Sequence, residues 1–172
     1  IPRRFKSFCI LIPLLALLLQ ACTSGSPASP PQASGNLEEV SEVVAEPAIT
    51  DQARFATGDG EEISGLVYGQ GDIGIVLAHM RGRGQSSWAE FATQASDSGY
   101  VVLTFDFRGY GDSTGTKDKR MDRDLEAAVR YMLFVENVRK VVIIGASMGG
   151  TAAITIADEY NIAAVAAISP ST

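Results

Sequence analysis

The sequence has little cysteine, histidine and basic charge, and each shortage narrows the classes of protein to which it can belong. Its 172 residues include two cysteines and one histidine, His79. Two cysteines cannot build a disulfide framework or a cysteine-rich zinc site, and a single histidine limits metal chemistry. Lysine and arginine number 14 against 20 acidic residues, for a net charge of −6. An acidic chain without basic runs binds nucleic acid poorly, so we expect neither a metal nor a nucleic-acid partner.

The rest of the composition is that of a globular protein. Hydrophobic residues make up 46% of the chain and charged residues 20%. These fractions exclude a collagen, a coiled coil and a wholly disordered chain. The length suits one domain with little left over.

The first 22 residues have the organisation of an export signal. Three basic side chains precede an apolar run at residues 9–19, which is too short to span a bilayer. Leu19-Gln20-Ala21-Cys22 follows and resembles the lipobox of bacterial lipoproteins. The resemblance implies that residues 1–21 are a signal peptide and that acylated Cys22 holds the exported protein at a membrane of the cell envelope. An ordinary secretory signal and an uncleaved anchor are the alternatives.

Residues 22–48 differ in amino-acid composition from the remainder of the chain. They are rich in serine, proline and alanine and contain four of the seven prolines. Without apolar periodicity, such a stretch cannot bury enough surface to offset the entropy lost on ordering. We expect a flexible tether at 22–48 and a single α/β domain at 49–172.

Within that domain, short apolar runs alternate with helical patterns. Continuous apolar runs predict buried strands, and apolar residues spaced i, i+4, i+7 and i+8 predict amphipathic helices. The expected strands are residues 53–57, 63–68, 73–78, 100–107, 141–144 and 162–168. The expected helices are 87–98, opened by a capping box of Ser87 and Glu90, then 118–137 and 148–160. The alternation indicates a mostly parallel sheet with helices on both faces, whose ligands bind at the carboxyl ends of the strands.

The sharpest motif follows the strand at 141–144 and opens the next helix. It reads Gly145-Ala146-Ser147-Met148-Gly149, a G-x-S-x-G pattern. A nucleophile needs a strained turn of this kind to lift its oxygen above the sheet, and Gly145 and Gly149 let strand and helix approach closely. Here the sequence resembles the α/β-hydrolase superfamily. The resemblance implies Ser147 as the catalytic nucleophile and the backbone N–H of Met148 as one oxyanion-hole donor, whereas a serine that only caps a helix is the alternative.

The identity of the residue at this position also narrows the chemistry that the resemblance implies. Haloalkane dehalogenases and epoxide hydrolases of this fold use aspartate there, and dienelactone hydrolases proper use cysteine. Serine favours hydrolysis of an acyl bond.

The loop at residues 79–84 fits the same resemblance. It reads His-Met-Arg-Gly-Arg-Gly, where the family has His-Gly-x and takes its second oxyanion donor. The resemblance implies that this donor is the N–H of Arg81, or of Met80. The family orders its triad as serine, acid, histidine, so we expect His79 to support the loop and not to act as the base.

A third loop, at residues 106–113, is similar to the D-x-R-G-x-G-x-S turn of many α/β-hydrolases. Its first and third residues, Asp106 and Arg108, can tie the loop by charge and hydrogen bonds. The family's acid follows the nucleophile, so we expect both residues to be structural anchors.

The resemblance covers about residues 53–169 and implies an N-terminal portion of a serine hydrolase. Such an enzyme cleaves an ester-like acyl bond of a small molecule through an acyl-enzyme, without cofactor. We expect the triad acid and base to be missing from this chain, incomplete at its C-terminus. The alternatives are a serine peptidase or acyltransferase of the same fold, and a non-catalytic envelope lipoprotein in which the nucleophile elbow, the turn at residues 145–149, is vestigial. The substrate and the oligomeric state are open.

Overall fold

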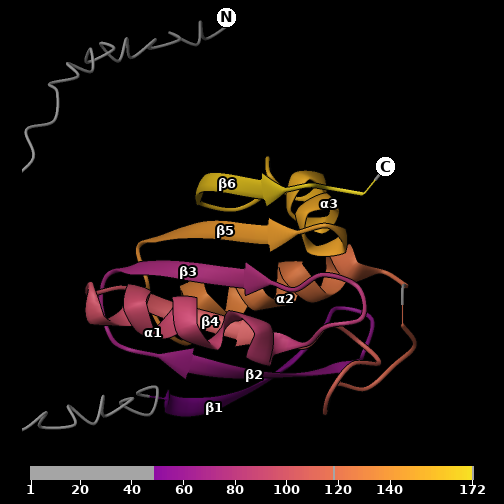
Figure 1. The fold of residues 1–172 in the computed structure, drawn as a ribbon, viewed down its shortest axis with the longest axis horizontal. Helices are drawn as coiled ribbons and strands as arrows, with labels where there is room; N and C mark the ends of the chain where they lie inside the picture. The colour runs from indigo at the N-terminus through magenta and orange to yellow at the C-terminus, as the bar shows by residue number, and fades with distance from the viewer. Residues whose placement is uncertain (1–48, 118, 172) are drawn as a thin grey trace, which may run out of the picture. The chain divides into compact units, whose positions relative to one another are not determined.

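A six-stranded sheet forms the centre of the fold. The computed structural model describes residues 49–117 and 119–171 (Figure 1). The expected signal peptide and tether, and Cys22 between them, lie outside these residues. The strands are β1 (Ile49–Ala56), β2 (Glu62–Tyr68), β3 (Ile73–Ala78), β4 (Val101–Phe105), β5 (Lys140–Ala146) and β6 (Ile162–Ile168). The helical segments are the 3₁₀ turn η1 (Gln85–Trp88), α1 (Ala89–Asp97), α2 (Met121–Phe134) and α3 (Met148–Thr155).

The strands lie in the order β1-β2-β4-β3-β5-β6. β4, β3, β5 and β6 are parallel, whereas β2 runs antiparallel to both of its neighbours. The parallel strands all end on one side of the molecule (Figure 1). The loops that follow these strands therefore meet at one edge of the sheet. They include the loop with Arg81 and the turn with Met148, the two predicted oxyanion donors.

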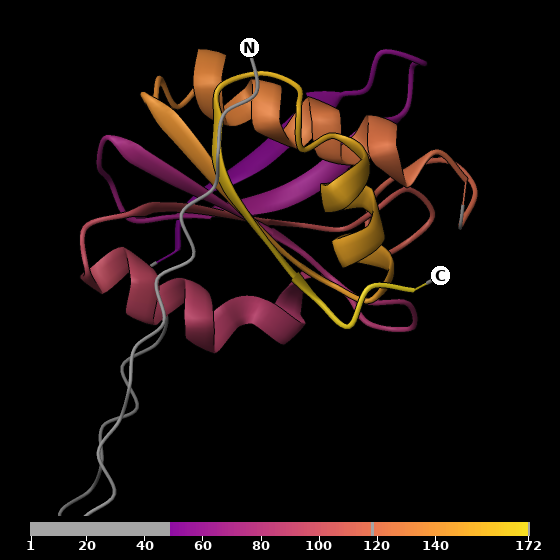
Figure 2. The same cartoon turned by 90° about the horizontal axis from the view of Figure 1, so that it is seen from above.

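Helices cover the two faces of the sheet, which confirms the predicted fold class. α1 lies on one face, and α2 and α3 lie on the other (Figure 2). The predicted apolar stripe of α2 forms the core, because Leu125, Ala128, Val129 and Met132 are fully buried. The helix begins later than expected because Arg120, which precedes it, has a left-handed backbone with φ 50°, and it also ends earlier than expected, at Phe134.

The start of the first helix differs from the prediction. Residues 85–88 form η1, and α1 begins only at Ala89, with Trp88 as an N-cap whose side chain makes no capping hydrogen bond. The proposed capping box is wrong, because the Ser87 hydroxyl donates to the carbonyl of Gly84 at 2.7 Å. The end of the helix is as predicted, with Gly99 at φ +87° two residues after Asp97.

The last strand is less buried than its apolar sequence predicts. Every residue of β6 is half-buried or exposed, and Ile168 keeps 51% of its surface accessible. The physical reason is its position, since β6 pairs with β5 alone and lies at the edge of the described sheet. Among residues 49–117 and 119–171, no helix has the length and hydropathy needed to cross a membrane.

Candidate active site

The predicted nucleophile, Ser147, lies at the carboxyl end of β5 on the turn into α3. Its backbone has φ 48° and ψ −112°, a conformation that costs a non-glycine residue free energy. The turn is sharp because strand and helix touch. A Cβ atom on Gly145 would collide with the backbone of Gly149, and one on Gly149 would collide with the backbone of Ala78. Glycine is therefore required at both positions, because any side chain there would collide with neighbouring backbone.

Backbone hydrogen bonds hold this elbow in place. The N–H of Ser147 donates to the carbonyl of Ile168 at 2.8 Å, and its carbonyl accepts from the N–H of Thr151 at 2.9 Å. The residue is half-buried, and its hydroxyl has no hydrogen-bond partner among the residues that the structure describes. The hydroxyl is thus presented at the end of the sheet without a competing contact.

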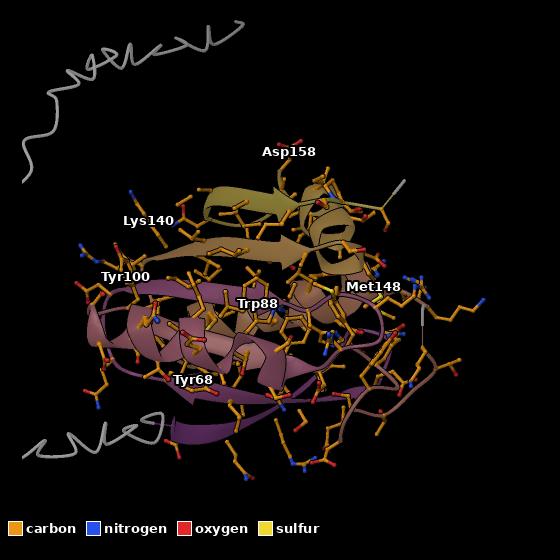
Figure 3. All side chains as sticks on the ribbon, in the orientation of Figure 1. Tyr68, Trp88, Tyr100, Lys140, Met148 and Asp158 are labelled. Carbon is orange, nitrogen blue, oxygen red and sulfur yellow. The ribbon has the colours of Figure 1, made fainter. Side chains whose placement is uncertain are left out.

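The two candidate oxyanion donors border the same hollow. Met148 is the first residue of α3, so its N–H is one of the free donors at the positive end of the helix. Met148 and Arg81 both line a hollow of about 290 Å³. The other lining residues are Met121, Asp122, Thr151, Ala152, Thr155 and Ser171. Figure 3 shows Met148 at the end toward which the parallel strands point, opposite Tyr100 and Lys140.

His79 is fully buried and both of its ring nitrogens are occupied by backbone groups. Nδ1 donates to the carbonyl of Met80 at 2.9 Å, and Nε2 accepts from the N–H of Phe107 at 3.1 Å. Because a carbonyl only accepts and an N–H only donates, these partners fix the neutral Nδ1–H tautomer. Burial lowers the pKa of His79, although the Met80 carbonyl and Asp106 oppose the change. A ring held in this way joins the ends of β3 and β4, and no hydrogen bond between it and Ser147 occurs in the described part of the chain.

Asp106 connects the loop after β4 to the loop after β3. Its Oδ1 accepts from the backbone N–H of Gln85 at 2.8 Å, and its Oδ2 accepts from the Gln85 amide Nε2 at 2.9 Å. Gln85 is not among the residues predicted from the sequence. The partners are 21 residues apart, and no local pattern marks a glutamine in a loop as the partner of a distant carboxylate.

Arg108 lies in a second network, in which Arg108 and Asp124 are buried and the side chain of Asp59 is 32% exposed. Its guanidinium binds Asp124 of α2 at 2.7 Å and Asp59 of the β1–β2 turn at 2.9 Å. Hydrogen bonds from Arg108 hold the pKa of Asp59 well below its usual range. The same contact with Asp59 raises the pKa of Arg108. Neither aspartate is predicted from the sequence, because Arg108 lies 49 residues from Asp59 and 16 residues from Asp124.

No set of three histidine, cysteine, aspartate or glutamate side chains within residues 49–117 and 119–171 could hold a metal ion. The groups that gather at the carboxyl ends of the strands are a hydroxyl and backbone N–H donors. This arrangement is suited to a nucleophile with anion-stabilising donors beside it.

The fold and the elbow together define a class, that of α/β enzymes whose reactive side chain stands on a strand–turn–helix junction. Residues 75–172 match the model of the alpha/beta hydrolase family. The chain belongs to this family.

Several known proteins are similar to this chain. A 2-hydroxy-6-oxononadienedioate/2-hydroxy-6-oxononatrienedioate hydrolase of a Pseudomonas species is 30% identical over 122 residues, which cover 66% of this chain and 43% of that protein. A solved esterase of Pyrococcus furiosus is 28% identical with a TM-score of 0.61, over 70% of this chain and 50% of that one. Epoxide hydrolase A of Mycobacterium thermoresistibile is 27% identical with a TM-score of 0.58, over 68% of this chain and 38% of that one. The chain thus spans half or less of the length of each.

Proposed function

We propose that this protein is a serine hydrolase that cleaves ester-like acyl bonds through a covalent acyl-enzyme. One observation carries the proposal. Ser147 stands on a strained turn, its hydroxyl has no partner in the described part of the chain, and Met148, the next residue in the sequence, lines a hollow together with Arg81. The hydrolase and esterase names of similar proteins support the same class.

In the proposed mechanism, Ser147 Oγ attacks the carbonyl carbon of the substrate. As the C–O bond forms, the carbonyl π electrons move to the oxygen, and this oxyanion accepts hydrogen bonds from the N–H groups of Met148 and Arg81. A histidine takes the hydroxyl proton and passes it to the leaving alcohol as the ester bond breaks. Water then attacks the acyl-enzyme by the same steps, releasing the acid and restoring Ser147.

We place the histidine base and its carboxylate partner outside these 172 residues. His79 is the sole histidine, and both of its nitrogens are bound to backbone groups. Serving as base would require it to leave the contact that joins the ends of β3 and β4. Asp106 is likewise occupied by Gln85.

The proposed substrate is a small molecule with an acyl bond. The elbow carries serine and not the aspartate that epoxide hydrolases of this fold use, which favours acyl transfer over epoxide opening. The Pseudomonas relative is named for a nine-carbon dicarboxylate, so compounds of that type belong in a substrate screen beside short-chain aryl esters. Peptides and alternative acyl acceptors in the same screen separate an esterase from a peptidase or an acyltransferase.

A fluorophosphonate probe should label the full-length protein at Ser147. An activated serine displaces fluoride from the phosphorus and keeps the phosphonyl group, so mass spectrometry of the digested protein should find the adduct on the peptide that contains Ser147. The matched control is Ser86→Ala, which removes an exposed serine outside the elbow and should leave labelling unchanged. Labelling that survives Ser147→Ala would refute the proposal.

We also propose that the protein is lipid-anchored at the cell envelope, on the basis of Leu19-Gln20-Ala21-Cys22. Each buried acyl methylene contributes about 0.8 kcal/mol to membrane binding, so two or three chains suffice for stable attachment. A tethered enzyme of this kind would meet substrates outside the cytoplasm.

Cys22→Ala should abolish the incorporation of labelled fatty acid and leave a longer, unprocessed precursor. Cys9→Ala is the matched control, because Cys9 lies inside the expected signal peptide and should not affect acylation. The measurement is metabolic labelling with palmitate followed by immunoprecipitation. Equal labelling of the Cys22→Ala protein would exclude the anchor.

A further inference from the structure

Two side-chain contacts anchor the ends of the loop that carries Arg81. Residues 80–83 are exposed, and the backbone hydrogen bond within them joins Arg83 N–H to the Met80 carbonyl at 3.2 Å. Before them, His79 is bound to the N–H of Phe107, and after them Gln85 is bound to Asp106. The position of the Arg81 N–H therefore depends on how firmly these two ends are held.

We propose that Gln85 is the positioning residue of this loop and acts through the carboxylate of Asp106. The inference rests on the proposed function, in which the Arg81 N–H stabilises the oxyanion. Gln85 touches neither the hollow nor Ser147, and its effect on catalysis is exerted through the backbone of residues 79–84.

Gln85 fixes the Asp106 carboxylate by a two-point contact. Its backbone N–H binds Oδ1 at 2.8 Å and its side-chain Nε2 binds Oδ2 at 2.9 Å, so one residue holds both oxygens. The amide oxygen of Gln85 accepts from the hydroxyl of Thr104 at 3.3 Å, which sets the direction of the amide. Since a carboxylate only accepts, the nitrogen must face Asp106.

The backbone of Gly84 and Gly111 approaches this carboxylate closely. A Cβ atom on Gly84 would lie 2.8 Å from Asp106 Oδ1, and one on Gly111 would collide with Oδ2. Asp106 is 5% exposed, and its Oδ1 lies 3.9 Å from Nε2 of His79. The carboxylate is thus enclosed between the loops after β3 and β4. It lies beside His79 at the start of the Arg81 loop and binds Gln85 at its end.

A displaced donor weakens the transition state more than it weakens substrate binding. The oxyanion exists only during reaction, so loss of an N–H from its position lowers kcat with little change in KM. A displacement of about 1 Å can lower the rate by about 100-fold. A loss of overall stability would also lower the apparent kcat at constant KM, so kcat is expressed per folded enzyme, counted by fluorophosphonate titration of Ser147.

The test is a rescue cycle in the full-length enzyme. Gln85→Glu places a second carboxylate against Asp106 and should lower kcat for an aryl ester by about 10- to 100-fold, with KM changed less than about threefold. Adding Asp106→Asn restores a donor, the asparagine amide, opposite the new carboxylate. The asparagine Oδ1 can still accept the backbone N–H of residue 85. The double variant should regain at least about tenfold in kcat over Gln85→Glu. Gln94→Leu, at an exposed position on α1, is the control for removing a glutamine.

Amide hydrogen exchange in residues 80–84 supplies a readout that does not need activity. Gln85→Glu should accelerate exchange there, and Asp106→Asn should restore it. Unchanged exchange, or an unchanged kcat together with Ser147-dependent turnover in the parent enzyme, overturns the role of Gln85 and leaves the proposed function intact. Absence of Ser147-dependent turnover in the parent enzyme overturns the proposed function, and the catalytic role of Gln85 with it, whatever the exchange data show.

Discussion

Ser147→Ala should lower kcat for a hydrolysable ester by at least about 10⁴-fold, because it removes the hydroxyl that forms the acyl-enzyme. The remaining oxyanion donors account for the residual rate, about 10³- to 10⁴-fold over water in a triad enzyme. The measurement is steady-state turnover of a short-chain aryl ester by the full-length protein. Activity within tenfold of the parent enzyme would show that Ser147 is not the nucleophile.

Ser147→Gly provides a second measurement at the same position. Glycine adopts φ 48°, ψ −112° without the steric penalty that serine has, so this variant should unfold at a higher urea concentration while being equally inactive. The gain should be about 1 kcal/mol. An enzyme that loses turnover and gains stability through one substitution has strain stored at its reactive residue, whereas an inactive and destabilised variant would indicate a purely structural serine.

Arg108→Leu should destabilise the domain by about 3–5 kcal/mol, because it leaves Asp124 without its ionic partner in the core. Asp124 is completely buried, and Arg108 is 4% exposed. The measurement is the urea midpoint at pH 7. Arg108→Leu/Asp124→Leu removes both charges and should recover most of the loss, since no unpaired carboxylate remains.

A separate, exposed ion pair is the control for this network, and Asp59→Asn tests the network's less buried end. Arg139→Leu breaks an ion pair with Asp72 whose side chains are 74% and 72% exposed, and it should cost less than about 1 kcal/mol. Asp59→Asn removes the carboxylate whose pKa Arg108 depresses. That carboxylate adds stability above its unfolded pKa, so the effect of Asp59→Asn should be largest at neutral pH and should shrink below about pH 4. A loss for Arg108→Leu no larger than that for Arg139→Leu would contradict the structure's buried network.

Local patterns predicted the features that depend on neighbouring residues. The strands at 73–78 and 162–168 match the bounds of β3 and β6, and the elbow at Ser147 lies where the glycine spacing placed it. These features could be predicted because apolar runs and turn glycines act within a few residues of themselves.

Features that depend on distant partners could not be predicted in this way. The capping box at Ser87 failed because its hydroxyl found the nearer carbonyl of Gly84, which turns the chain into η1. Gln85 and Asp124 are ordinary polar residues in the sequence, and only the packing of the loop after β4 against α2 and η1 gives them partners. The exposure of β6 follows from its place in the sheet, which its apolar sequence does not encode.

The strand order also determines when each strand can pair with its neighbours as the chain is synthesised. β1 and β2 leave the ribosome first and pair as a local hairpin, yet the other neighbour of β2 is β4. β4 begins at Val101, roughly thirty residues after β2 ends at Tyr68, and translation of that length takes a few seconds. During this interval the inner edge of the hairpin has no partner, and Val67 and Ile63, both buried in the finished core, have nothing to pack against. The nascent chain is therefore most exposed to misassociation before β4 emerges, and the parallel strands that create the elbow are assembled last.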